Sequence, residues 1–267
     1  MPKPKTVFLG EMTNPEIERH LAERGDKSMV LIPIGSFEQH GPSGPVLTDT
    51  YIPTEVCRRV AERTGRVVAP SVPYGLSYPH KGFTGVVYLR MSTFAALVED
   101  LCAQFATMGF KRIVFVNGHY DNTYAVAYAC ASAGETLPKG VRAYVINYWD
   151  GMAPDAAGEF MGGDEGLHAN KGEISGVMAV NPDYVDMDAA TSEMPPFPEV
   201  GNVAAVHTAF FFSSPGSVYR ATHSGAWGDA REASVEFGER YLTAVVDGTV
   251  KLLDDIERTQ AAMPDRP

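Results

Sequence analysis

A chain of 267 residues with 45% hydrophobic content is long and apolar enough to bury the core of one α/β domain. Its formal net charge of −11 argues against nucleic acid or an anionic membrane as the main partner, because both require a basic surface. The three cysteines are widely spaced, and no segment reaches about 18 uncharged apolar residues. We therefore expect reduced cysteines and a cytoplasmic protein without a membrane span or an export signal.

Short apolar runs rich in branched side chains alternate along the chain with helical patterns. A helix start at Thr13 or Asn14 leads into residues 16–25, where His20 lies among charges and is expected to be solvated. The expected strands are 29–34, 66–70, 112–116 and 141–147. The expected later helices are 50–65, 94–109, 125–137, 174–182 and 231–255. Strand, loop and helix in repetition predict an α/β fold with a mainly parallel sheet, and no linker divides residues 1–267 into two domains.

Two helices carry apolar stripes that predict which side chains are buried. In the helix 94–109 the stripe is Leu97, Leu101, Phe105 and Met108, and in the last helix it is Val235, Phe237, Leu242 and Val245. Two other segments are expected to be irregular or to contact a partner. These are 151–170, which is rich in Gly, Ala and acidic residues, and the Phe-rich stretch 203–218.

Residues that can bind metal ions follow the strand 29–34. Glu38 and His40 are two positions apart, so an extended backbone would point both side chains to one face. The Pro/Gly-rich turn 41–45 can then fold Asp49 back onto that face. Carboxylate and imidazole ligands suit zinc or manganese, and one carboxylate can bridge two such ions. The alternative is that each is an ordinary polar loop residue.

Two later segments carry the same residue types. His119 and Asp121 come directly after the strand 112–116, and His168 and Glu173 follow the segment 151–166. Because open α/β sheets place their sites at the carboxyl ends of strands, we expect these segments to meet Glu38, His40 and Asp49. Each group alone is weak evidence, but together they indicate a hydrolase with two metal ions. The chain has no G-x-G-x-x-G, P-loop, G-x-S-x-G or HExxH motif, which leaves nucleotide, serine and zincin mechanisms without their key parts.

The segments that hold these residues resemble the signature of the creatininase family. GSFEQHGPSGPVLTD matches the family's pattern around E-Q-H-G, NGHYDN matches its N-G-H loop, and HANKGEIS matches a later H-A-G segment. The resemblance runs in order from Val7 to Asp188. It implies a three-layer α/β/α sandwich around a mainly parallel sheet, two divalent ions that are commonly Zn²⁺ or Mn²⁺, and assembly as a homo-oligomer, often a hexamer.

The resemblance also implies roles for particular residues. Glu38 and His119 would hold one ion, His40 the other, and Asp49 would bridge them; either Asp121 or Glu173 would complete the second site. His168 matches the histidine that handles protons, and such a residue can protonate the nitrogen that leaves when hydroxide attacks an amide. Tyr120 and Trp149 match residues of the family's substrate pocket. Ser77 and His80, the chemically capable residues of the loop 71–85, are also expected to contact the substrate, although a histidine in an aromatic loop often only donates one hydrogen bond.

Departures from the family pattern bear on the substrate. Ser43 replaces a family histidine, the segment 83–86 replaces an F-P-G-T loop, and Leu167 stands where an acid precedes the catalytic histidine. The family pattern also has a tryptophan of the substrate lid near the position of Asp164, where this chain has no tryptophan. We therefore expect attack by metal-bound hydroxide on a small cyclic amide, with another compound favoured over creatinine. The alternatives are hydrolysis of a lactone or another polarised ring carbonyl, and a non-catalytic metal-binding scaffold.

Overall fold

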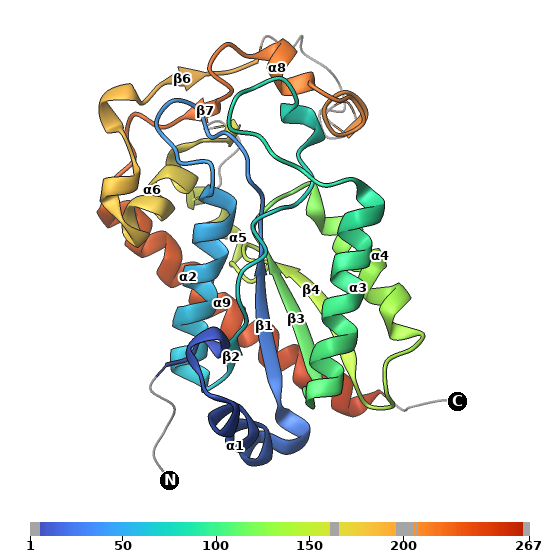
Figure 1. Ribbon diagram of the computed structural model, residues 1–267. Helices are drawn as coiled ribbons and strands as arrows, with labels where there is room; N and C mark the ends of the chain where they lie inside the picture. Colours follow the sequence, from blue (N-terminus) through green and yellow to red (C-terminus); the bar gives the residue numbers. More distant parts are fainter. Residues whose placement is uncertain (1–5, 161–165, 196–205, 207, 264–267) are drawn as a thin grey trace.

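The computed structural model describes residues 6–160, 166–195, 206 and 208–263, and its central element is a parallel sheet (Figure 1). The sheet has the strand order β2-β1-β3-β4. Its strands are β1 (Met29–Ile34), β2 (Val67–Val68), β3 (Arg112–Asn117) and β4 (Arg142–Asn147). Ile34, Asn117 and Asn147 lie side by side in register, so β1, β3 and β4 end at the same level. The segments that follow these strands therefore begin together at one edge.

Helices cover both faces of the sheet. One layer contains α1 (Asn14–Arg24), α3 (Met91–Met108) and α4 (Asn122–Gly134), and the other contains α2 (Thr48–Thr64), α6 (Lys171–Val180) and α9 (Val235–Ala262). Successive residues of β1 face opposite layers: Val30 and Ile32 join the core under α3 and α4, whereas Met29 and Leu31 join the core under α2 and α9. The three-layer α/β/α prediction is confirmed.

The buried faces of three helices differ from the sequence prediction. In α3 the buried stripe is Phe94, Val98, Cys102 and Ala106, one position away from the expected one, and Met108 at the helix end is 46% exposed. α9 begins four residues later than expected, which leaves Val235 in its first turn 41% exposed. His20 of α1 is buried rather than solvated, because α1 packs its ring near Phe110, 6.4 Å away between centroids.

A second, antiparallel sheet stands beyond the carboxyl edge and was not predicted. Its strand order is β5-β7-β6, from β5 (Gly166–His168), β6 (Ser192–Glu193) and β7 (Trp227–Asp229). The segment 151–170, expected to be irregular, contains α5 (Pro154–Phe160) and β5, while Asp164 lies outside the described residues. Of the stretch 203–218, the structure describes position 206 and the positions from 208 onward.

The remaining described elements are short. They are η1 (Leu9–Glu11), η2 (Gly25–Lys27), η3 (Tyr78–His80), η5 (Pro182–Tyr184), η6 (Met187–Ala189), the π-helical turn η7 (Thr208–Phe212) and α8 (Ser217–Ala221). Cys57, Cys102 and Cys130 are buried and free of disulfides, as expected. Within the described ranges no helix is long and apolar enough to cross a membrane.

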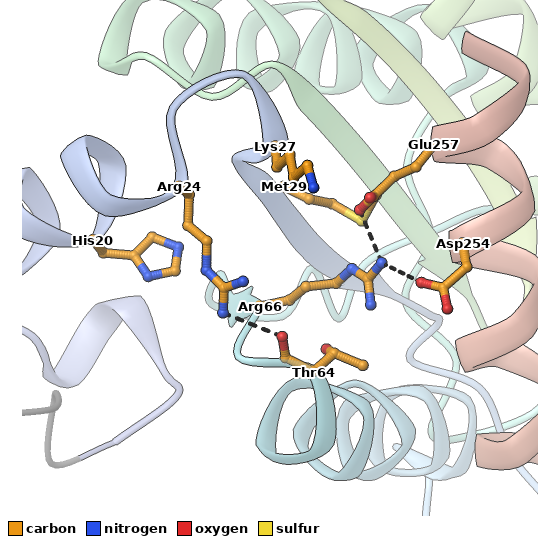
Figure 2. Close-up of a pocket in the computed structure, with 8 residues that line it drawn as sticks. All are labelled: His20, Arg24, Lys27, Met29, Thr64, Arg66, Asp254 and Glu257. Atoms are coloured by element: carbon orange, nitrogen blue, oxygen red, sulfur yellow. Dashed lines mark hydrogen bonds and ion pairs between the residues drawn. The ribbon is translucent and has the colours of Figure 1, made fainter. Parts of the chain in front are cut away.

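A cavity of about 170 Å³ lies at the opposite, amino end of the parallel strands (Figure 2). Arg66, the residue before β2, reaches across it toward α9, where its Nη2 donates to Asp254 at 2.9 Å and Glu257 at 2.8 Å. Arg24 donates to the main-chain oxygen of Thr64 at the end of α2. These contacts join three helices and a strand at the end of the molecule that is remote from the carboxyl edge.

Candidate metal centre

The candidate ligands come from four segments that meet at the carboxyl edge of the sheet. Glu38 and His40 lie in the loop after β1, and His119 and Asp121 lie between β3 and α4. Asp49 stands in the first turn of α2, because that helix begins at Thr48 rather than at about residue 50. Glu173 stands in the first turn of α6, whose cap Asn170 accepts from its main-chain nitrogen. The structure thus brings together all six residues predicted as metal ligands.

Asp49 lies between the two histidines of this cluster. Its Oδ1 is 3.1 Å from His40 Nε2, and its Oδ2 is 2.8 Å from His119 Nδ1. The Ser36 hydroxyl donates to Oδ2 at 2.7 Å. A Cβ on Gly35 would stand 2.3 Å from the Asp49 main-chain oxygen, so only glycine allows the loop and the helix to approach so closely. The two oxygens of one carboxylate therefore face two different imidazoles, as a bridging ligand requires.

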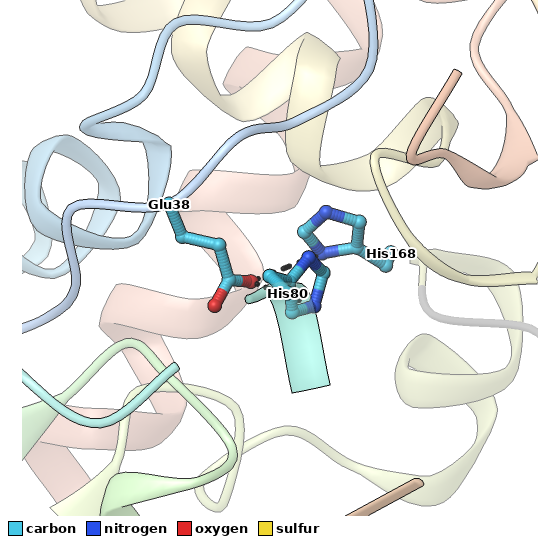
Figure 3. Close-up of side chains that lie close together, drawn as sticks. All are labelled: Glu38, His80 and His168. Carbon is cyan, nitrogen blue, oxygen red and sulfur yellow. Dashed lines mark ion pairs between the residues drawn. The ribbon is translucent and has the colours of Figure 1, made fainter. Parts of the chain in front are cut away.

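Glu38 is buried on the other side of the cluster. Its Oε1 is 3.2 Å from His80 Nε2 and 3.6 Å from His168 Nδ1, as Figure 3 shows. Its Oε2 is 3.4 Å from His119 Nε2. Oε2 of Glu38 and Nε2 of His119 are both buried without a hydrogen-bond partner among the described residues. Buried polar atoms are rarely left in this state, so the gap between them fits a cation.

The two acids that the sequence left as alternatives lie on different sides of the cluster. Asp121 Oδ2 is 3.8 Å from His119 Nε2, beside Glu38. Glu173 Oε2 is 4.0 Å from His40 Nε2 and accepts from the Ala169 main-chain nitrogen at 2.7 Å. Ala169 has φ of 53°, the positive value of a strained non-glycine residue, directly beside His168. Each of the two ligand histidines therefore has an acid of its own.

Burial and the close imidazoles together set the pKa values of the acids in the cluster. Burial raises the pKa of Glu38 to about 8, that of Glu173 to about 7 and that of Asp121 to about 6. Burial alone would also raise the pKa of Asp49, but His40 and His119 hold it well below its usual value. Burial opposes protonation of His40 as well, yet the nearby Asp49 raises its pKa to about 9.

Three overlapping groups of side chains have the spacing of metal ligands. They are Glu38 with His80 and His168, His40 with His168 and Glu173, and Glu38 with His40 and Asp49. All ligand atoms of a group lie within 4.8 Å of one another. A set of carboxylates and imidazoles suits Zn²⁺ or Mn²⁺. His168 belongs to two of the groups, so the geometry admits it as a ligand as well as a proton carrier.

The four residues expected to contact substrate lie in different surroundings. His80 is buried inside the cluster against Glu38, and Ser77 is fully buried one turn before it in the same loop. Tyr120 is 52% exposed next to His119 and stacks on Phe212, with ring centroids 4.6 Å apart. Trp149 packs edge-on against the buried ring of Tyr148. Tyr120 therefore lies at the surface beside the cluster, whereas His80 is buried and contacts Glu38.

Sequence reasoning did not single out Gln39, which stands between two candidate ligands. Its side chain approaches His80, His168 and the main chain at Gly225. The one signal in the sequence was the position of Gln39 between Glu38 and His40. On an extended backbone, its side chain points to the face opposite to theirs. Its partners lie up to 186 residues away, and no local pattern could reveal them.

Comparison with known proteins identifies the family of the chain. A family model described as "Creatininase: Creatinine amidohydrolase" matches residues 10–253. The chain belongs to the creatininase family. It is 32% identical over 259 residues to a creatinine amidohydrolase of Pseudomonas putida, covering 91% of this chain and 95% of that protein. It is 33% identical to a mycofactocin precursor peptide peptidase of Mycolicibacterium smegmatis, covering 89% of this chain and 87% of that protein.

Membership of this family makes the chain a hydrolase, and its relatives differ in substrate. A 3-dehydro-scyllo-inosose hydrolase of Thermotoga maritima is 28% identical, over 96% of this chain and 85% of that protein. The fold matches a crystal structure of creatininase with a TM-score of 0.81 and 30% identity, over 94% of this chain and 98% of that chain. Other creatininase structures are described as Mn and Zn-Zn forms, which together with the ligand cluster supports use of divalent metal.

Proposed function

We propose that the protein is a hydrolase with two divalent metal ions that opens a small cyclic amide. The observation that supports this most directly is the position of Asp49, whose two oxygens face His40 and His119 at 3.1 and 2.8 Å. The unpartnered buried atoms of Glu38 and His119 support it further, because a cation between them would satisfy both. A centre of this kind fits the acidic, histidine-rich cluster better than it fits an ordinary polar core.

The proposed ligands form two sets that share Asp49. Glu38, His119 and Asp121 would hold one ion, and His40 and Glu173 would hold the other. This division follows the side of the cluster on which each acid lies. It uses Asp121 and Glu173 together, rather than one of them alone. The ions would be Zn²⁺ or Mn²⁺.

The chemistry divides between these ions and His168. Divalent ions in such a centre polarise a substrate carbonyl and lower the pKa of a bound water toward about 7. His168 Nδ1 is 3.6 Å from Glu38 Oε1, at the rim of the cluster, where it can take a proton and give it to the departing nitrogen. Burial lowers the pKa of His168 well below its usual value, so the ring is neutral, and its protonated form would release the proton readily to the departing nitrogen.

The substrate class rests on the relatives and on the departures in this chain. One creatininase structure is described as complexed with creatine, which supports a small molecule. Leu167, beside His168, is 53% exposed and presents an apolar surface where the family pattern has an acid. We therefore propose a cyclic amide other than creatinine. The inosose hydrolase among the relatives favours a second candidate, a ring with another polarised carbonyl such as a lactone or ketone.

Assembly and location are proposed with the same function. Tyr120, Tyr124 and Tyr128 stand at helical spacing, on or directly before α4, and are 52%, 70% and 77% exposed. Such an aromatic surface is typical of a contact with another protein chain, which supports a homo-oligomer, with a hexamer as our proposal. We also propose that residues 1–267 form one domain and that the protein acts in the cytoplasm.

Metal analysis combined with substrate profiling tests this function. We expect roughly two ions per chain in protein purified without chelator, and ring opening of one compound in a panel of cyclic amides, imides, lactones and creatinine. Turnover of a lactone or ring ketone alone would move the assignment to the second candidate. Absence of metal and of turnover after Zn²⁺ or Mn²⁺ is added would favour a non-catalytic scaffold.

A further inference from the structure

Two main-chain groups fix the orientation of the buried Gln39 amide. The Gly41 nitrogen donates to Gln39 Oε1 at 2.8 Å, and Gln39 Nε2 donates to the Gly225 main-chain oxygen at 2.9 Å. Because a main-chain N–H only donates and a carbonyl only accepts, the oxygen and nitrogen of the amide can occupy only these positions. Gly225 has φ of 87°, and a Cβ there would stand 2.1 Å from Gln39 Oε1. A glycine at 225 is therefore required for Gln39 to reach this place.

The second amide proton of Gln39 determines the tautomer of His80. Gln39 Nε2 is 2.8 Å from His80 Nδ1, so Nδ1 must accept and cannot carry a proton. The neutral His80 ring then carries its proton on Nε2, which is 3.2 Å from Glu38 Oε1. A doubly protonated ring is disfavoured, since its Nδ1 proton would face the amide protons of Gln39. His80 therefore donates to Glu38 through one defined atom.

The main-chain oxygen of Gln39 determines the tautomer of His168 in the same way. His168 Nε2 is 2.8 Å from that oxygen, and a carbonyl only accepts, so Nε2 carries the proton. The 3.3 Å approach of Gln39 Nε2 to the same His168 atom is then not a hydrogen bond, because both amide protons are committed elsewhere. The lone pair of His168 is left on Nδ1, which faces Glu38 Oε1.

We propose that Gln39 is a positioning residue that sets the tautomers of His80 and His168 from behind the metal centre. Through His80 it holds Glu38 Oε1, which leaves Oε2 for the gap beside His119 Nε2. Through its main chain it presents the unprotonated Nδ1 of His168 to the reacting groups. The catalytic consequence rests on the proposed function, but the tautomers follow from the hydrogen bonds alone. Partners behind metal ligands typically change metal affinity or activity about 10–100-fold.

The structure separates the effects of the Gln39 side chain from those of its main chain. In Gln39→Glu the carboxylate still accepts from Gly41, but it has no N–H for His80 Nδ1 or for Gly225. His80 is then expected to carry a proton on Nδ1, whereas His168 keeps its proton on Nε2. The exposed Gln104 on α3 provides the matched control Gln104→Glu, which makes the same chemical change outside the site.

Histidine ¹⁵N NMR of the metal-free and metal-loaded protein tests the proposal, because the imidazole nitrogen shifts distinguish the tautomers. We expect Nε2–H for His80 and His168 in the wild type and in Gln104→Glu, and a change confined to His80 in Gln39→Glu. Gln39→Glu should also lose about 10–100-fold in kcat, with a smaller change in KM. Nδ1–H on wild-type His80, or no change at His80 in Gln39→Glu, would overturn the proposal.

The wild-type spectrum keeps the test valid if Gln39→Glu does not fold. The same data separate the positioning role of Gln39 from the proposed hydrolase function. The expected tautomers in a protein that binds no metal and turns over nothing would leave the positioning intact and remove the proposed function. Metal-dependent turnover with the opposite tautomers would remove the positioning role and leave the proposed function intact.

Discussion

The two ends of the parallel sheet both gather charged side chains, but they balance the charges differently. At the amino end, Arg66 pairs with Asp254 and Glu257 across the small cavity (Figure 2). At the carboxyl end, Glu38, Asp49, Asp121 and Glu173 are at least half buried, and every ion pair that the described chain gives them is with a histidine.

The difference separates an internally balanced network from a site that needs a ligand. A guanidinium keeps its charge at every accessible pH, so the ion pairs of Arg66 form without a bound cation, although Arg66 Nε is itself buried without a hydrogen-bond partner among the described residues. An imidazole is charged only when protonated, and burial raises the pKa of Glu38 to about 8 and of Glu173 to about 7. The acids of the carboxyl-end cluster therefore hold protons near neutral pH, and divalent cations would take the place of those protons.

The largest expected effect is that of Asp49→Ala at the carboxyl end. Removing the carboxylate that faces both His40 and His119 should release both ions and lower turnover by more than about a hundredfold, the upper range for residues that only support a ligand. The protein should remain folded but be less stable. Metal content and circular dichroism on the same sample check this. A variant that keeps both ions and its activity would rule out the bridging role.

His168→Ala should lower the rate without removing metal. A positioned proton carrier contributes about 10²–10⁴-fold to such reactions, so kcat should fall by that factor while the metal content stays at the wild-type level. The measurement is steady-state kinetics beside metal analysis. If the ions are lost instead, His168 acts as a ligand, as its place in two of the three ligand groups allows.

At the carboxyl end, the sequence predicted the residues that lie close together along the chain. Glu38, His40 and Asp49 lie within one segment, and His119 and Asp121 follow a clear strand, so spacing and periodicity sufficed to find them. The parallel strands and the burial of their apolar residues followed from the same patterns. The resemblance to the creatininase family added the proposed roles of these residues, among them that of His168, and the family assignment is confirmed.

Features set by long-range packing were not predicted. The small sheet β5-β7-β6 joins strands of two or three residues, too short to leave a periodic signal. His80 was expected to contact substrate, but it faces Glu38 because a separate loop folds over the cluster. The stripe of α3 was displaced by one position, since several of its apolar residues fit either face and only contact with the sheet decides between them.

Single substitutions of Asp121 and Glu173 test whether each of these acids holds a different ion. Glu173→Gln should weaken the ion beside His40, and Asp121→Asn should weaken the ion beside Glu38 and His119. Each variant should then retain about one tightly bound ion of the two expected. Metal titration with competition by a chelator measures this. Loss of metal in only one variant would show that a single acid completes the centre.

The stability of the metal-free protein should fall as pH rises, and bound metal should remove this fall. Without metal, Glu38 and Glu173 have folded pKa values of about 8 and about 7, above their usual value of 4.5, so their effect on stability worsens as pH rises toward those values. The raised pKa of His40, about 9, adds a stabilising term that is present below 6.5 and lost through about pH 9.

Thermal unfolding between pH 7 and 9 measures this effect. Over this range we expect Tm of the chelated protein to fall, by about 2–4 °C for each kcal/mol lost. With Zn²⁺ or Mn²⁺ present, Tm should be higher and should not fall, because protons compete with metal for the same ligands. Parallel curves with and without metal would show that no ion binds at these groups.

The smallest expected effect is that of Asp254→Asn at the amino end. The Asp254 side chain is 57% exposed, and Arg66 keeps Glu257 as a partner, so the lost pair should cost about 1 kcal/mol or less. Metal content and turnover should stay at the wild-type level, since this network lies at the far end of the strands. Unfolding in denaturant at low and high salt measures the loss, which should shrink as salt screens the pair. A large loss of metal or turnover would show that the two ends are coupled, and the contrast between a balanced network and a ligand-dependent one would then fail.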